Sequence, residues 1–163
     1  MPLDLDEFNR TDPERVRALL TACLDVPRWV DAVLAGRPYP DLEAVFLAAK
    51  AATPLLPEEI RRAMDAHPRI GEKPAKDDTG ARWSRSEQSG VDDSAAAEFR
   101  AANAAYEERF GHVYLVCASG RSGGELLADL RARLANDPET ELAVAGSELA
   151  KIAQLRLEKA VTA

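Results

Sequence analysis

Apolar residues recur every three or four positions along most of the 163-residue chain, which is the spacing of one face of an α-helix. Val16, Leu20 and Cys23 belong to the first such stripe, and Leu149 and Ile152 belong to the last. The pattern predicts helices over residues 11–24, 28–34, 41–52, 57–66, 84–88, 92–109, 122–134 and 137–157. We therefore expect an all-α fold, a single-domain bundle of about seven or eight helices that spans residues 1–163.

Residues that favour helix ends mark most of these boundaries. Thr11, Asp41, Ser122 and Asp137 each precede an apolar stripe, and their side-chain oxygens can accept a hydrogen bond from the first helical turn. Gly111 should end the helix before it, because glycine adopts the left-handed backbone conformation without strain. Residues 113–116 are β-branched, aromatic or aliphatic. Since helices flank them, we expect an extended connection rather than a strand of a sheet.

Composition narrows the class of protein. The net charge is −7 and the acidic and basic residues are evenly scattered, which argues against a nucleic-acid-binding surface. No apolar run approaches the ~20 residues that a membrane-spanning helix needs, and the first residues do not resemble a signal peptide. The two cysteines lie far apart in apolar surroundings, so we expect buried thiols rather than a disulfide. These features predict a cytoplasmic protein without membrane or nucleic-acid partners.

The stretch from Met64 to Val91 departs from the helical pattern and carries most of the candidate chemistry. His67 directly precedes Pro68, and a residue before proline is disfavoured in the helical region, so His67 should end the helix that begins at Pro57. The carboxyl end of a helix carries partial negative charge, which favours the imidazolium form and predicts a raised pKa for His67. We therefore expect His67 to donate a proton near neutral pH.

Glu87 has two interpretations that its spacing leaves open. It is the third residue after Ser84, where a glutamate completes a capping box and so has a structural use. It is also a carboxylate that follows a polar loop from His67. By composition alone, Arg85 and Gln88 are typical of a solvated surface.

Paired cysteines and a His-x-x-x-His spacing are absent from the sequence, as are the glycine-rich nucleotide motifs, so we expect no metal and no nucleotide cofactor.

Five short motifs occur in a fixed order over nearly the whole chain. They are Phe8–Asn9, His67–Lys73, Trp83–Gly90, Phe110–Ser122 and Lys151–Leu157. In order and spacing they resemble the family of decarboxylases that act on 2-oxo-4-hydroxy-4-carboxy-5-ureidoimidazoline (OHCU) in urate degradation. A single His-Pro step would not be specific, whereas five ordered motifs are.

The resemblance implies an all-helical, homodimeric enzyme of the cytoplasm that uses no cofactor. It implies that His67 is the catalytic histidine and Glu87 its partner carboxylate. It further implies a set of substrate-binding residues drawn from three segments of the chain: Pro68, Ser84, Arg85, Ser86, Gln88, Ala118, Ser119 and Arg156. One position departs from the family pattern, because His112 stands where phenylalanine is commoner, and this leaves open whether the pocket wall is altered.

The implied reaction is chemically simple. The substrate carboxylate sits on a carbon that also bears a hydroxyl and adjoins an imine carbon, so loss of CO2 pushes an electron pair into the C=N system. The enzyme then has to deliver a proton to one face, which sets the configuration of (S)-allantoin. Two other functions remain open at this stage. One is a non-catalytic helical interaction module, and the other is a hydrolase of a related ureido compound.

Overall fold

The computed structural model describes residues 2–67 and 96–163, and most of these residues are helical. The all-α prediction is confirmed, with eight helices in the two described ranges. They are α1 (Leu5–Arg10), α2 (Pro13–Cys23), α3 (Pro27–Ala35), α4 (Leu42–Ala51), α5 (Pro57–Met64), α7 (Ala96–Phe110), α8 (Gly123–Arg133) and α9 (Pro138–Ala160).

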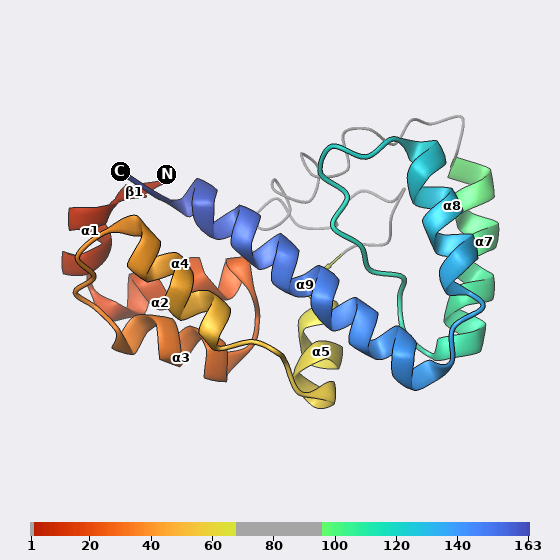
Figure 1. Cartoon of the computed structure of the whole chain (residues 1–163), viewed down its shortest axis with the longest axis horizontal. Helices are drawn as coiled ribbons and strands as arrows, with labels where there is room; N and C mark the ends of the chain where they lie inside the picture. Colours follow the sequence, from red (N-terminus) through yellow and green to blue (C-terminus); the bar gives the residue numbers. More distant parts are fainter. Residues whose placement is uncertain (1, 68–95) are drawn as a thin grey trace.

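The long helix α9 connects the two parts of the molecule. Figure 1 shows α9 running between the group formed by α1 to α4 and the pair formed by α7 and α8, with α5 packed against its middle. Its 23 residues correspond to a length of about 35 Å at the usual rise of ~1.5 Å per residue. Because α2, α4 and α5 all contact α9, this helix sets the relative positions of their ends.

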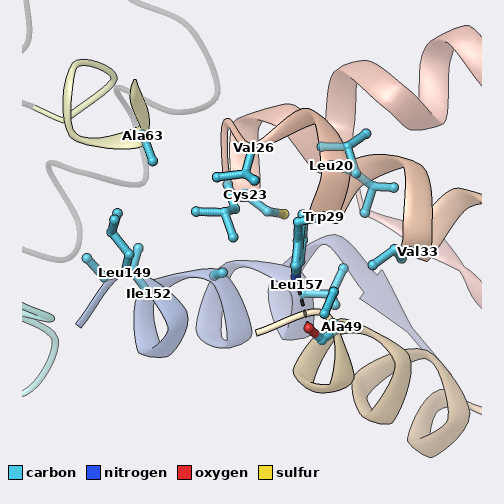
Figure 2. Close-up of a cluster of buried hydrophobic side chains, with 14 of the residues drawn as sticks. Leu20, Cys23, Val26, Trp29, Val33, Ala49, Ala63, Leu149, Ile152 and Leu157 are labelled. Atoms are coloured by element: carbon cyan, nitrogen blue, oxygen red, sulfur yellow. Dashed lines mark hydrogen bonds between the residues drawn. The ribbon is translucent and has the colours of Figure 1, made fainter. Parts of the chain in front are cut away.

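The larger core lies between α9 and the amino-terminal helices, and Trp29 of α3 is at its centre. Trp29 is 1% exposed, and its indole N–H donates to the carbonyl of Ala49 on α4 at 3.0 Å (Figure 2). Leu149, Ile152 and Leu157 of α9 belong to the same cluster (Figure 2). A buried tryptophan with its N–H paired contributes a large apolar area without leaving an unsatisfied donor.

A second, smaller core forms between α7, α8 and the connection before α8. Phe99 and Tyr106 come from α7, Leu126 and Leu130 come from α8, and Tyr114 comes from the connection. The connection over residues 113–118 is not helical and forms no strand, as the sequence predicted. Its side chains alternate between the two cores, with Val113, Leu115 and Cys117 against the larger core and Tyr114, Val116 and Ala118 in the smaller one.

The predicted helix ends are largely confirmed. Asp41, Ser122 and Asp137 each accept a hydrogen bond from the N–H three residues on, at 2.8 Å, 3.2 Å and 2.8 Å respectively. Gly111 has a φ of +76° directly after α7, which is the left-handed conformation expected of a helix-ending glycine. The first predicted helix begins one residue later than expected, because its cap is Asp12 and not Thr11.

The sequence did not predict the elements at the two ends of the chain. A two-residue strand β1 (Leu3–Asp4) pairs in parallel with β2 (Val161–Thr162), and α1 follows β1 directly. Asp4 accepts from the N–H of Glu7 at 2.8 Å, and the Glu7 side chain accepts from the N–H of Asp4 at 3.2 Å. Strands of two residues are too short to show an alternating pattern.

Within the described residues, none of the helices has the length and apolar character to cross a membrane.

The contact between α5 and α9 requires a small residue at Gly146. A Cβ atom built there would lie 2.7 Å from Ile60 Cδ1 and 3.2 Å from Ile60 Cγ1. Glycine in a helix interior usually costs about 1 kcal/mol relative to alanine, so the close approach of the two helices explains its presence. This approach fixes α5, and with it the residues that follow α5.

We predict that Gly146→Ala and Ile60→Val interact. In the wild-type background the added methyl group crowds Ile60, and overpacking of this kind costs ~1 kcal/mol or more. Removing Ile60 Cδ1 relieves the contact, so Gly146→Ala should be about 1 kcal/mol more favourable in the Ile60→Val background. Urea unfolding of the two single variants and the double variant measures this coupling. Strict additivity of the three free energies would contradict the proposed steric role of Gly146.

Candidate active site

His67 lies at the end of the turn that follows α5. The N–H groups of Asp65, Ala66 and His67 donate to the carbonyls three residues before each of them, at 3.2 Å, 3.1 Å and 3.0 Å. The α-helix itself ends at Met64, two residues before the predicted Ala66, because these tighter bonds replace the regular pattern. His67 is the last residue of this turn that the structure describes, and its N–H continues the same tight bonding.

Arg156 of α9 is the residue that the structure brings to His67. It is 2% exposed, and its Nη1 donates to the carbonyl of Ala22 near the end of α2 at 2.9 Å. A helix leaves its last carbonyls unpaired, so this bond satisfies an acceptor and holds the guanidinium in place. The charge of Arg156 acts directly on the His67 imidazole. Two predicted site residues from distant segments of the sequence therefore lie within electrostatic range.

The expectation of a raised pKa for His67 was wrong. Burial of the imidazole, together with the nearby charge of Arg156, lowers the pKa of His67 to about 3. The partial charge at the end of a helix is weaker than these two effects, because ring desolvation and a full positive charge both oppose protonation. His67 is therefore neutral at pH 7, and its resting form can accept a proton.

A cavity of about 580 Å³ includes His67 in its wall. The cavity lies between the ends of α5 and α7, and its wall also contains charged residues of both signs. Its other lining residues are Arg61, Arg62, Met64, Asp65, Glu107, Phe110, Gly111, His112 and Val113.

His112, the position that departs from the family pattern, thus shares a cavity wall with His67. Its ring stacks on Phe110 with the centroids 6.1 Å apart, and its Nδ1 lies 3.1 Å from the carbonyl oxygen of Val113. The His112 and Tyr106 rings are also in edge-to-face contact, with their centroids 5.6 Å apart. These contacts hold the His112 ring in a defined orientation beside the site.

Ala118 and Ser119 lie in a tight turn between the connection and α8. The N–H of Arg121 donates to the carbonyl of Ala118 at 3.1 Å, and Gly120 has a φ of +76°. Ala118 is buried and Ser119 is partly exposed. Ala118, Ser119 and Arg156 are all absent from the described lining of the cavity that contains His67, and Arg156 is linked to His67 through its charge.

The remaining predicted site residues lie outside the described part of the chain. They are Pro68, Ser84, Arg85, Ser86, Glu87 and Gln88. Their roles, including Glu87 as the partner of His67, stay predictions. Among the residues that the structure does describe, no group of three or more His, Cys, Asp or Glu is placed to hold a metal ion.

The sequence did not predict a buried ionic network that joins α7, α8 and α9. Glu141 is fully buried and accepts hydrogen bonds from Arg133 Nε at 2.8 Å, from Arg133 Nη2 at 2.8 Å and from the Tyr106 hydroxyl at 2.6 Å. Burial raises the pKa of Tyr106, and the bond to Glu141 raises it further. Arg133 also donates to the carbonyl of Leu115 at 2.7 Å. The sequence carries no signal for this network, since both charged residues lie in ordinary amphipathic helices.

The fold and this site define an all-α protein whose candidate site pairs a neutral imidazole with a guanidinium, groups suited to acid–base chemistry on an anion. A model of the OHCU decarboxylase family matches residues 9–158, which is nearly the whole chain. The chain belongs to the OHCU decarboxylase family.

Similar proteins support this assignment. The chain is 34% identical over 135 residues to a 2-oxo-4-hydroxy-4-carboxy-5-ureidoimidazoline decarboxylase of Amia calva, covering 78% of this chain and 76% of that relative. It is 40% identical over 103 residues to the uric acid degradation bifunctional protein TTL of Arabidopsis thaliana, covering 60% of this chain. That match spans 32% of the bifunctional protein, so about two thirds of that relative has no counterpart in the alignment.

A solved structure has the same fold. The crystal structure of an OHCU decarboxylase in the presence of (S)-allantoin superposes with a TM-score of 0.72 at 25% sequence identity. The superposition covers 91% of this chain and 96% of that one. The similarity therefore extends over most of the chain and is not limited to one motif.

We predict that His67 stays neutral throughout the range from pH 7.5 to 5. The Cε1–H resonance of His67, assigned by its loss in His67→Asn, should not titrate in this range, because the pKa lies near 3. The unfolded state binds a proton near pH 6.5 that the folded state does not bind, so the free energy of unfolding should fall as the pH is lowered below 6.5. This slope should be smaller in His67→Asn. A titration midpoint for His67 between pH 6 and 7 would contradict the desolvated site.

Proposed function

We propose that the chain converts OHCU to (S)-allantoin and CO2 in urate degradation. Membership of the OHCU decarboxylase family supports this proposal, and so does the similarity to a structure determined in the presence of (S)-allantoin. The observation that carries the mechanism is the desolvated His67 imidazole beside the buried Arg156 guanidinium. A neutral base next to a fixed positive charge is suited to an anionic substrate that bears a hydroxyl group.

In the proposed mechanism His67 accepts the proton of the substrate hydroxyl. As the bond to the carboxylate breaks and CO2 leaves, the electron pair moves into the adjacent C=N bond, and the ring nitrogen takes a proton from solvent. The hydroxyl carbon is then joined to the neighbouring carbon by a C=C bond. The imidazolium returns the hydroxyl proton to one face of the neighbouring carbon, which sets the S configuration and converts the hydroxyl carbon to a carbonyl. Acid–base assistance of this kind typically accelerates a reaction by ~10² to 10⁴.

Arg156 is proposed to bind the anionic part of the substrate. Its guanidinium is planar and carries N–H donors in a geometry that suits a carboxylate, and the bond to Ala22 helps to hold it in place. Its fixed position on α9 means that little side-chain entropy is lost when the substrate binds. The predicted roles of Glu87 in orienting His67, and of Gln88 and the Ser84–Ser86 run in binding polar groups, complete the proposal.

We also propose that the chain forms a homodimer through a groove between α4 and α9. The groove encloses about 680 Å³, and Phe46, Leu47 and Leu155 contribute apolar side chains to it. Leu47 is 58% exposed. Two acidic and two basic side chains line the same groove, so its charges can pair with those of a second copy related by a twofold axis. They are Glu43, Lys50, Lys151 and Glu158.

A cytoplasmic location is part of the proposal. Cys23 is buried and Cys117 is partly buried, and both are thiols rather than a disulfide. Thiols of this kind are typical of a reducing compartment.

We predict that His67→Asn and Glu87→Ala abolish accelerated formation of (S)-allantoin. The substrate is generated in situ from urate by a urate oxidase and a ring-opening hydrolase, and circular dichroism follows the product. Each variant should lose at least ~10²-fold in kcat/KM, because the proton-transferring group or its partner is missing. Glu58→Gln is the control. Glu58 is exposed on α5, the helix that precedes His67, so this variant should keep full activity.

Other functions would give different results in this assay. A non-catalytic interaction module would leave racemic product forming at the spontaneous rate, even with the wild-type chain. A hydrolase of a ureido compound would release ammonia or cleave the ureido group without producing optically active allantoin. Wild-type turnover in either His67→Asn or Glu87→Ala would remove the assigned roles while leaving the overall activity in place.

We predict that Leu47→Glu dissociates the dimer. In the proposed dimer, a carboxylate at this apolar position of the groove would be buried against another copy, which costs several kcal/mol. Leu56→Glu is the matched control, since Leu56 is 50% exposed and does not line the groove. Sedimentation velocity should show a dimer for the wild type and Leu56→Glu, and a species of 17.7 kDa for Leu47→Glu. A monomeric wild type, or equal dissociation of both variants, would exclude this interface.

A further inference from the structure

The turn that contains Ala118 and Ser119 is held at both ends by carboxylates from two helices. On α9, Glu148 Oε1 accepts from the backbone N–H of Cys117 at 3.2 Å and lies 3.9 Å from Arg121 Nη1. On α8, Asp129 Oδ1 lies 3.7 Å from Arg121 Nη2. One end of the turn is therefore fixed through its backbone and the other through a guanidinium between two acids.

Burying the Glu148 carboxylate for this contact costs free energy. Its side chain is 9% exposed, and burial of a carboxylate is unfavourable unless several partners compensate. Three partners are present, because Lys151 Nζ also lies 2.6 Å from Glu148 Oε2. An apolar side chain at this position would avoid the desolvation cost but could not accept the Cys117 N–H. The carboxylate is thus suited to holding the backbone of a segment that has no regular hydrogen-bond ladder.

The network continues inward and leaves little freedom to the residues before the turn. Asp129 Oδ2 accepts from the Tyr114 hydroxyl and lies 3.5 Å from Arg133 Nη1. Arg133 donates to the carbonyl of Leu115. Leu115 and Cys117 are therefore both bound through their backbone groups, by charged side chains of α8 and α9 respectively. These charged side chains therefore fix the backbone that leads into the following turn.

We infer that Glu148 and Arg121 are positioning residues for the decarboxylation, which hold the turn from Cys117 to Arg121, whose residues Ala118 and Ser119 are predicted to bind the substrate. This inference rests on the proposed function. Glu148 lies on the same helix as Arg156, so the pair ties the turn to the element that carries the proposed anion-binding group. A displacement of about 1 Å in a substrate-positioning group can cost ~10²-fold in rate, which makes such fixation consequential. Arg121 acts through the turn and is not itself the substrate-binding arginine.

The test compares Glu148→Ala, Glu148→Gln and Arg121→Gln with the matched control Glu139→Gln, an exposed glutamate on the same helix. Activity per folded molecule, KM and the enantiomeric excess of allantoin are measured at 25 °C, and circular dichroism establishes the folded fraction. Glu148→Ala should lower kcat/KM by about 10- to 100-fold and reduce the enantiomeric excess. Glu148→Gln keeps an acceptor for the Cys117 N–H and should lose less. Glu139→Gln should match the wild type.

Non-additivity separates a positioning pair from two independent effects. If Glu148 and Arg121 act together, the double variant Glu148→Gln/Arg121→Gln should lose no more activity than the worse of the two single variants. Should Glu148→Ala fail to fold, the two glutamine variants and their combination decide the question alone.

Two results would overturn the inference while the proposed function stands. One is a folded Glu148→Ala enzyme with the kcat, KM and enantiomeric excess of the wild type. The other is a set of variants with a lower Tm but full activity per folded molecule, which would show a purely structural role. An inactive wild type overturns the proposed function, and the positioning role with it.

Discussion

The ion pair between Arg133 and Glu141 is the interaction on which the carboxyl-terminal half of the structure depends. Arg133 is 5% exposed and Glu141 is fully buried, so neither charge can be compensated by water. Burial lowers the pKa of Arg133, but the hydrogen bonds and charge of Glu141, together with Tyr106 and Tyr114, outweigh burial and raise this pKa. Removing one partner of such a pair typically costs about 3–5 kcal/mol, because the other charge stays buried and alone. The pair therefore fixes α8 against the start of α9.

This pair also explains how a connection without regular secondary structure is held in a core. Arg133 donates to the Leu115 carbonyl, and its guanidinium lies 4.7 Å from the centre of the Tyr114 ring. A cation over an aromatic face adds to the attraction, and more so when both groups are desolvated. The connection leads into the turn that Glu148 holds, and Cys117 in that turn also lines the groove between α4 and α9. Core, turn and proposed dimer surface thus adjoin along α9.

The sequence predicted local features well because they depend on neighbouring residues. The caps at Asp41, Ser122 and Asp137 and the left-handed Gly111 need only a few adjacent positions to form. The position of His67 at the end of its segment followed from Pro68 in the same way. Long-range features were not predictable from local spacing. The pairing of Arg133 with Glu141 requires α8 and α9 to be placed in three dimensions first, and the strands β1 and β2 join opposite ends of the chain.

The pKa of His67 shows how a correct residue can be assigned the wrong charge. Its position after a helix was visible in the sequence, but its burial and the charge of Arg156 on α9 depend on the tertiary structure. In the proposed reaction these long-range effects have a direct consequence. A substrate carboxylate near Arg156 offsets the positive charge and makes protonation of His67 easier while the substrate is bound. Once CO2 leaves as a neutral molecule, that compensation is lost, so Arg156 again disfavours the imidazolium and favours proton transfer to the product carbon.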